Sequence, residues 1–186
     1  MQAPTETDLW TIWTRIQAGD ERAFRALFDQ LYPYLTTTAY QYVYDTSKAR
    51  DLAQDVFVEL WDKRSERQIT GSVRAYLRRA VVNKSLNYLK RERRIEARDP
   101  LELPDTAETS DGVEAKLAGE ELEARIQSTI ASLPERCRVI FCLNRFEEKT
   151  HKEISEQLGI SPKTIENQMT KALKILRAAL QHLPIL

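Results

Sequence analysis

Apolar residues recur every three to four positions through most of the chain, and no alternating strand pattern persists. This spacing predicts amphipathic helices, so the expected fold class is all-α. The first helix should be capped by Thr7 or Asp8 and ended by Gly19. Its apolar stripe is Leu9, Ile12, Trp13 and Ile16.

Three more helices are predicted in the first half of the chain. Asp20 can cap the second, but Pro33 cannot continue a helix undisturbed, so a new helix or a kink should begin there. Residues 45–47 are typical of a turn and a cap before the next helix. The polar composition of residues 62–72 predicts a loop. A long helix should start near Val73.

Residues 98–117 contain two prolines, a glycine and many carboxylates, with little apolar content. Such a composition indicates an extended, flexible acidic linker and a domain boundary. The chain should therefore form two small helical domains, at 5–97 and 118–183. Helical periodicity resumes near Leu117, and Pro134 is expected to be the first residue of a later helix.

The segment from Thr150 to Leu176 carries the clearest local pattern. Thr150 and Glu153 form a capping box, Gly159 suits a left-handed turn, and Ser161 can cap a second helix. A short helix, a glycine turn and a longer helix predict a helix-turn-helix in the C-terminal domain. An ordinary helical hairpin is the alternative. The residues predicted to face inward are Ile165, Met169, Ala172, Leu173 and Leu176.

Charge is segregated along the chain although its formal net charge is zero. Residues 74–98 carry a local net charge of +7, and residues 99–123 carry −8. Blocks of opposite sign cancel in the total but not in space, and binding to a polyanion depends on the local field. A nucleic-acid partner is therefore compatible with this composition.

Several classes of protein are not favoured by the sequence. Cys137 and Cys142 are five residues apart in one predicted helix, which favours reduced packing thiols over a disulfide. The two histidines have no zinc-finger spacing to these cysteines, and no phosphate loop or catalytic set is present. We therefore expect no cofactor and no catalytic activity. The N-terminus lacks the features of a secretory signal, and no apolar run is long enough for membrane insertion, so the expected location is cytoplasmic.

Three segments, in this order, resemble the extracytoplasmic-function (ECF) sigma factors of bacterial RNA polymerase. They are DLAQDVFVELW at 51–61, YLRRAVVNKSLNYLKRERR at 76–94, and the region from Leu133 to Leu176. The resemblance implies that the first docks on the β′ clamp of core RNA polymerase. It also implies that the second melts and reads the −10 element. The third would read the −35 element and pack on the β flap. Promoter DNA and an anti-sigma factor are the further partners expected.

This resemblance assigns candidate residues to three surfaces. The polymerase contact would use a mostly anionic outer face, for which a solvated acidic face is the alternative: Asp51, Gln54, Asp55, Val58, Glu59 and Trp61. The −10 contact would combine cations for phosphates with amides for base edges: Arg74, Arg78, Arg79, Asn83, Lys84, Asn87, Lys90, Arg91 and Arg94. The −35 contact would use the outer face of the recognition helix: Ser161, Lys163, Thr164, Glu166, Asn167, Thr170, Lys171 and Lys174.

Some alternatives stay open from the sequence. Tyr76 and Tyr88 can either contact DNA or pack in the core, and the loop at 62–72 is placed to line a pocket for a flipped base. The linker is either a plain tether or a segment threaded near the RNA exit path of the polymerase. An autonomous helix-turn-helix repressor or activator is the competing function, although the two N-terminal segments do not resemble a ligand or dimerisation domain. Glu166 is acidic where many ECF sigma factors have a basic residue, so no −35 sequence can be carried over.

Overall fold

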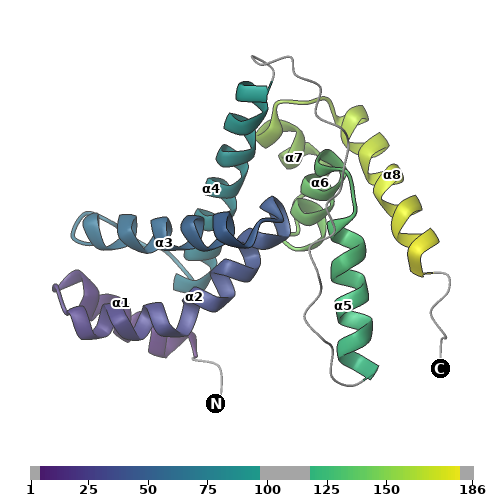
Figure 1. Ribbon diagram of the computed structural model, residues 1–186. Helices are drawn as coiled ribbons and strands as arrows, with labels where there is room; N and C mark the ends of the chain where they lie inside the picture. Colours follow the sequence, from purple (N-terminus) through teal and green to yellow (C-terminus); the bar gives the residue numbers. More distant parts are fainter. Residues whose placement is uncertain (1–4, 97–117, 181–186) are drawn as a thin grey trace. The chain divides into compact units, whose positions relative to one another are not determined.

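The computed structural model describes residues 5–96 and 118–180, with side chains given for 5–93 and 125–179 (Figure 1). These residues form eight helices and no strand, so the all-α prediction is confirmed. The chain divides into two compact units, one before and one after the undescribed stretch. The predicted acidic linker at 98–117 lies outside the described residues, and the predicted domain boundaries stay a prediction.

The N-terminal unit is built from α1 (Glu6–Gln17), α2 (Glu21–Val43), α3 (Thr46–Asp62) and α4 (Val73–Glu96). The long helix α2 packs against the other three, and α4 also contacts α1 and α3 (Figure 1). One core of buried apolar side chains joins all four helices. The largest fully buried side chains of this unit include Trp13, Tyr42 and Phe57.

Local caps explain where these helices begin. Asp20 accepts hydrogen bonds from two backbone N–H groups at the start of α2, and Asp45 caps α3, as the sequence predicts. The cap predicted for α1 was wrong, because Thr5 is the N-cap. Its hydroxyl accepts from the backbone N–H of Asp8, and the Asp8 carboxylate accepts from the backbone N–H of Thr5. No new helix begins at Pro33, which lies inside a continuous α2. Pro33 is exposed, so water can reach the backbone groups that its ring leaves unpaired.

Helix α1 and the loop at 63–72 hold the start of α4 in place. The backbone N–H of Val73 donates to Oε1 of Glu6 at 2.6 Å. The loop is tied down by Gln17, whose Nε2 donates to the carbonyl of Arg67 at 3.1 Å. Ile69 is buried in the core, so the polar loop folds back against the helices. These contacts fix the loop beside α3 and α4.

The C-terminal unit contains α5 (Ala118–Ala131), α6 (Glu135–Arg145), α7 (His151–Leu158) and α8 (Pro162–Leu180). Helix α8 packs against the other three. The predicted helix-turn-helix is confirmed in α7 and α8. Thr150 and Glu153 form the capping box, and Gly159 has a left-handed φ of 67°. The Oγ atom of Ser161 accepts a hydrogen bond from the N–H of Thr164.

Two predictions about this unit were wrong. Pro134 is the N-cap of α6 rather than its first helical residue, with an extended ψ of 139°. Leu173 was expected to face inward but is 49% exposed, whereas Leu176 is 7% exposed. The hydrophobic face of α8 is therefore narrower at its C-terminal half than the sequence pattern predicts.

Arg138 and Cys137 make polar contacts that tie the helices of this unit together. Nη1 of Arg138 donates to the carbonyls of Ala131 and Leu133, which closes the turn between α5 and α6. Cys137 places its Sγ atom 2.9 Å from Oε1 of Gln168 on α8. Both cysteines are buried, and neither takes part in a disulfide.

Candidate nucleic-acid interface

The outer face of α3 is anionic with one large apolar side chain. Asp51, Gln54, Asp55, Val58 and Glu59 are all exposed, as predicted from the helical spacing. Val58 is 58% exposed and lies among the carboxylates. An apolar centre with charged surroundings is the composition of a protein-binding surface.

Trp61, at the end of the same helix, is half-buried. Its ring lies 5.0 Å from that of Phe24, and the Arg64 guanidinium sits 4.2 Å above it. The indole packs against the core, and this cation covers a face of the ring. Trp61 therefore supports the end of the outer face and exposes only part of its ring.

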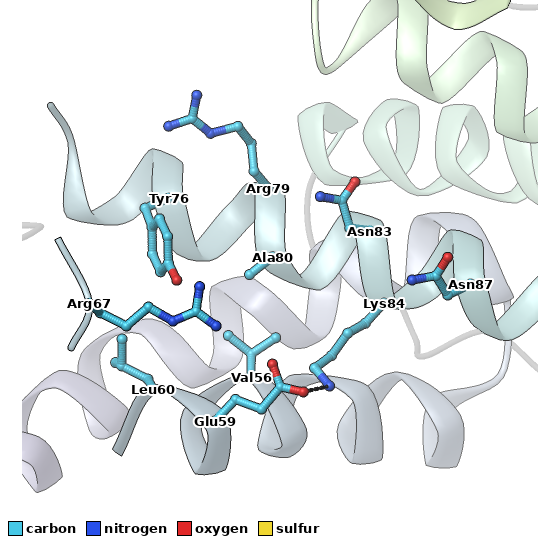
Figure 2. Close-up of a pocket in the computed structure, with 10 residues that line it drawn as sticks. All are labelled: Val56, Glu59, Leu60, Arg67, Tyr76, Arg79, Ala80, Asn83, Lys84 and Asn87. Carbon is cyan, nitrogen blue, oxygen red and sulfur yellow. Dashed lines mark hydrogen bonds and ion pairs between the residues drawn. The ribbon is translucent and has the colours of Figure 1, made fainter. Parts of the chain in front are cut away.

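A groove of about 500 Å³ lies between α3, the loop and α4 (Figure 2). We call it the α3–α4 groove. Both apolar and polar side chains line it. Its volume is large enough for a small planar group. It is lined by Val56, Glu59, Leu60, Arg67, Tyr76, Arg79, Ala80, Asn83, Lys84 and Asn87.

The groove brings together residues that the sequence assigned separately. Asn83 and Asn87 project from the same side of α4, one helical turn apart, and both are exposed (Figure 2). Tyr76 and Arg67 lie at the opposite end of the groove from Asn87. Tyr76 also packs on the hydrophobic core, which is one of the two alternatives considered for it, and its contact with DNA stays a prediction. Tyr88 packs on the core and does not line the groove.

Sequence reasoning missed Arg67 as a groove residue. It comes from the loop at 63–72, which the sequence placed near a pocket without naming a side chain. The one available signal was Ile69, an apolar residue in an otherwise polar loop. Burial of Ile69 draws the loop inward and brings Arg67 to the groove.

Lys84 crosses from α4 to α3 along one wall of the groove. Its Nζ atom lies 2.7 Å from Oε1 of Glu59 and 3.9 Å from Oδ2 of Asp55. The side chain of Lys84 is 22% exposed, against 50% for Glu59. The hydrogen bond from Lys84 lowers the pKa of Glu59 below its usual value. A candidate DNA contact and two candidate polymerase contacts are thus joined in one ionic cluster.

Two other candidate DNA contacts, Arg74 and Arg78, pack on Tyr34 of α2. Their guanidinium carbons lie 5.6 and 5.9 Å from the centre of the Tyr34 ring. Both side chains are half-buried. Arg79 is exposed and lines the groove instead. The cations of α4 thus differ in whether they contact the protein or reach solvent.

The basic end of α4 continues beyond the groove. Lys90 and Arg91 are exposed. Arg94 lies in the described part of the helix, but its side chain is outside the described residues. The exposed cations extend the positive charge of α4 past the end of the groove.

Most of the residues predicted to contact the −35 element from α8 are exposed to solvent. Seven of the eight −35 candidates are exposed, and Thr164, whose hydroxyl lies 2.9 Å from that of Ser161, is half-buried. Lys163 pairs with Glu166 at 3.2 Å. The exposed candidates are Ser161, Lys163, Glu166, Asn167, Thr170, Lys171 and Lys174.

The first helix of the motif adds two residues that sequence reasoning did not assign. His151 and Lys152 are exposed at the start of α7. In a helix-turn-helix, the first helix crosses the DNA backbone while the second enters the major groove. That rule was the signal that could have identified them as candidates for phosphate contact.

Among the described residues, no helix is both long and apolar enough to cross a membrane. The same part of the chain holds no group of histidine, cysteine and carboxylate side chains able to bind a metal ion.

Comparisons with known proteins match both units. Residues 27–95 match the family model of Sigma-70 region 2, and residues 123–176 match that of Sigma-70, region 4. The chain is 30% identical over 135 residues to RNA polymerase sigma factor SigZ of Bacillus subtilis, covering 73% of this chain and 74% of that protein. It is 28% identical over 166 residues to the ECF RNA polymerase sigma factor RpoE of Cereibacter sphaeroides, covering 88% of each.

A solved structure has a similar fold. It is the sigma factor RpoE of Bartonella quintana, in complex with the anti-sigma factor NepR. The TM-score is 0.55 at 19% identity, covering 86% of this chain and 97% of that one.

The chain belongs to the sigma-70 family of RNA polymerase sigma factors. Within that family it is an ECF sigma factor, and its function is to direct RNA polymerase to promoters for transcription initiation.

Proposed function

We propose that each of three surfaces of this sigma factor carries one step of initiation. The outer face of α3 binds core RNA polymerase, the α3–α4 groove receives a base of the −10 element, and α8 reads the −35 element. The observation that carries this proposal is the groove itself. It places the amides of Asn83 and Asn87 beside a space of about 500 Å³ on a basic helix.

The chemistry of the groove suits an unstacked base. The two amides can each donate and accept hydrogen bonds at a base edge. At the opposite end of the groove from Asn87, the Tyr76 ring and the Arg67 guanidinium offer flat surfaces on which an adjacent unstacked base can stack. Such stacking contributes about 1–3 kcal/mol per base. That gain is comparable to the few kcal/mol needed to unstack and unpair a base. Arg79, Lys90 and Arg91, together with Arg94, are proposed to hold the neighbouring phosphates.

Permanganate footprinting of holoenzyme on promoter DNA tests the groove. Asn83→Ala and Asn87→Ala should reduce thymine reactivity within the −10 element while core binding is unchanged. Gln30→Ala is a matched control, because it removes an exposed amide from α2 that does not line the groove. Wild-type reactivity in both asparagine variants would remove the groove from the −10 site.

The proposed polymerase contact uses Asp51, Gln54, Asp55 and Val58, with the exposed edge of Trp61 at its end. Carboxylates around an apolar side chain suit a basic partner such as the β′ clamp. Asp55→Arg should weaken binding to core polymerase strongly, and Gln54→Ala should weaken it mildly. A folded Asp55→Arg protein with unchanged core affinity would contradict this assignment.

The proposed −35 contact divides between phosphates and bases. Lys163, Lys171 and Lys174 are placed for phosphates, and the amides at the start of α8 can join them. Glu166 and Asn167 are placed for base edges, which are read in the major groove. The hydroxyls of Ser161, Thr164 and Thr170 complete this surface.

The remaining parts of the proposal concern the whole chain. We infer that it acts in the cytoplasm, has no catalytic activity of its own, and contacts the β flap through its C-terminal unit. A solved sigma factor of similar fold is bound to an anti-sigma factor, which supports a partner of that kind here. We also propose domains at 5–97 and 118–183 joined by residues 98–117. Limited proteolysis of the free protein should cut first within that stretch.

A further inference from the structure

Glu59 lies at the edge of the outer face of α3, on the side toward α4. At about 100° per residue, Val58 is roughly 20° from Asp51 around the helix axis, whereas Glu59 is roughly 80° away. Its carboxylate meets Lys84 at 2.7 Å, and both residues line the α3–α4 groove (Figure 2). Glu59 therefore faces the groove rather than the centre of the polymerase-binding face.

The bond between Glu59 and Lys84 leaves both groups able to bind something else. An ammonium has three donors, and Glu59 takes one of them. Asp55 is 3.9 Å from Nζ, beyond hydrogen-bond distance, so it adds negative charge without taking a second donor. The Glu59 carboxylate has two oxygens and accepts from Lys84 through only one.

This arrangement is poorly suited to a phosphate. The positive charge of Lys84 is balanced by one carboxylate in contact and a second nearby, so its attraction for an anion is reduced. A neutral partner with its own acceptor and donor fits better. A donor beside an acceptor complements a base edge that presents an acceptor beside an amino group.

We propose that Glu59 and Lys84 together read one base of the −10 element, and that Glu59 is not a polymerase contact. The carboxylate accepts from the exocyclic amino group of adenine or cytosine, while the ammonium donates to the neighbouring ring nitrogen. With the exocyclic group held against Glu59, thymine and guanine would present an oxygen to the carboxylate and a ring N–H to the ammonium. A base bound in this register is therefore adenine or cytosine. This inference rests on the proposed role of the groove as the −10 site.

The test is a selection by holoenzyme, formed with the full chain, on fork-junction DNA with a randomised −10 element. The wild type should favour adenine or cytosine at one position. Glu59→Ala should reduce that preference about fivefold or more, and leave the other positions and the core affinity unchanged. A role in stability alone would lower binding to every sequence equally. Lys84→Ala tests the same pair from α4 and should flatten the same position.

Asp51→Ala is the matched control, because it removes a carboxylate from the outer face of the same helix. It should weaken core binding and leave the base profile intact. The inference is overturned if Glu59→Ala and Lys84→Ala keep the wild-type profile while Asn83→Ala alters it. If none of the three alters any −10 preference, the proposed function of the groove fails as well. If Glu59→Ala loses affinity for core polymerase and keeps the wild-type base preference, Glu59 is a polymerase contact and the inference is wrong.

Discussion

The Nη1 atom of Arg78 on α4 donates a hydrogen bond to the hydroxyl of Tyr34 on α2, at a distance of 2.9 Å. The ring of Tyr34 also lies beneath the guanidinium groups of Arg74 and Arg78. A tyrosine 44 positions before Arg78 in the chain thus orients two of the cations on α4. Arg74 and Arg78 therefore connect α4 to α2. Arg79, the next residue, is exposed and lines the groove instead.

Alanine substitutions should separate these two roles. Arg78→Ala removes a hydrogen bond and a cation–π contact, so it should lower the free energy of unfolding by about 1–2 kcal/mol. Arg79→Ala removes an exposed cation and should change it by less than about 0.5 kcal/mol. Urea unfolding followed by circular dichroism measures both. Equal effects would show that Tyr34 does not anchor Arg78.

Acid should weaken the Glu59–Lys84 interaction. The hydrogen bond from Lys84 lowers the pKa of Glu59, so its stabilising effect is complete above the pKa of the unfolded chain. The effect is lost as the pH falls through the lower pKa of the folded state. The stability difference between wild type and Glu59→Gln should therefore be largest near neutral pH and shrink below about pH 4. A difference that stays constant to pH 3 would contradict this, and Asp51→Asn controls for loss of charge.

Glu166 on the recognition helix should affect base choice. In the free chain it pairs with Lys163 at 3.2 Å, an exposed contact worth only a few tenths of a kcal/mol. Because a carboxylate near phosphates is unfavourable, we expect it to accept from a cytosine amino group on binding. Glu166→Ala should relax preference at one −35 position by about 1–3 kcal/mol without abolishing binding. Selection on randomised −35 sequences measures the base preference of wild type and of Glu166→Ala. Identical preferences would mean that Glu166 only forms the ion pair with Lys163.

Helix boundaries were predictable where one residue determines them. Asp20, Asp45 and Thr150 bind backbone N–H groups within three residues of themselves, so the local sequence contains both partners. Gly159 supplies a left-handed conformation that its neighbours in the motif require. Such features depend on no distant contact.

Other features depend on partners that the local pattern does not reveal. Leu173 has the same hydrophobicity as Leu176, but only the latter is buried in the C-terminal unit. Arg78 has the spacing of an outward cation, and its position depends on Tyr34 from another helix. The α3–α4 groove likewise requires a loop residue, Arg67, that meets α4 only after Ile69 is buried. The local sequence determines where helices form and which faces are apolar. Contacts between side chains of different helices depend on the tertiary fold.

The most direct test of the account is transcription in vitro with core RNA polymerase, genomic DNA fragments and the full chain. The account predicts discrete transcripts that require the chain and start at a shared promoter element. It also predicts that Asn83→Ala holoenzyme assembles normally but makes far less of each transcript. If wild-type protein binds core polymerase yet produces no start site beyond those of core alone, or if Asn83→Ala transcribes like wild type, the central claim is contradicted.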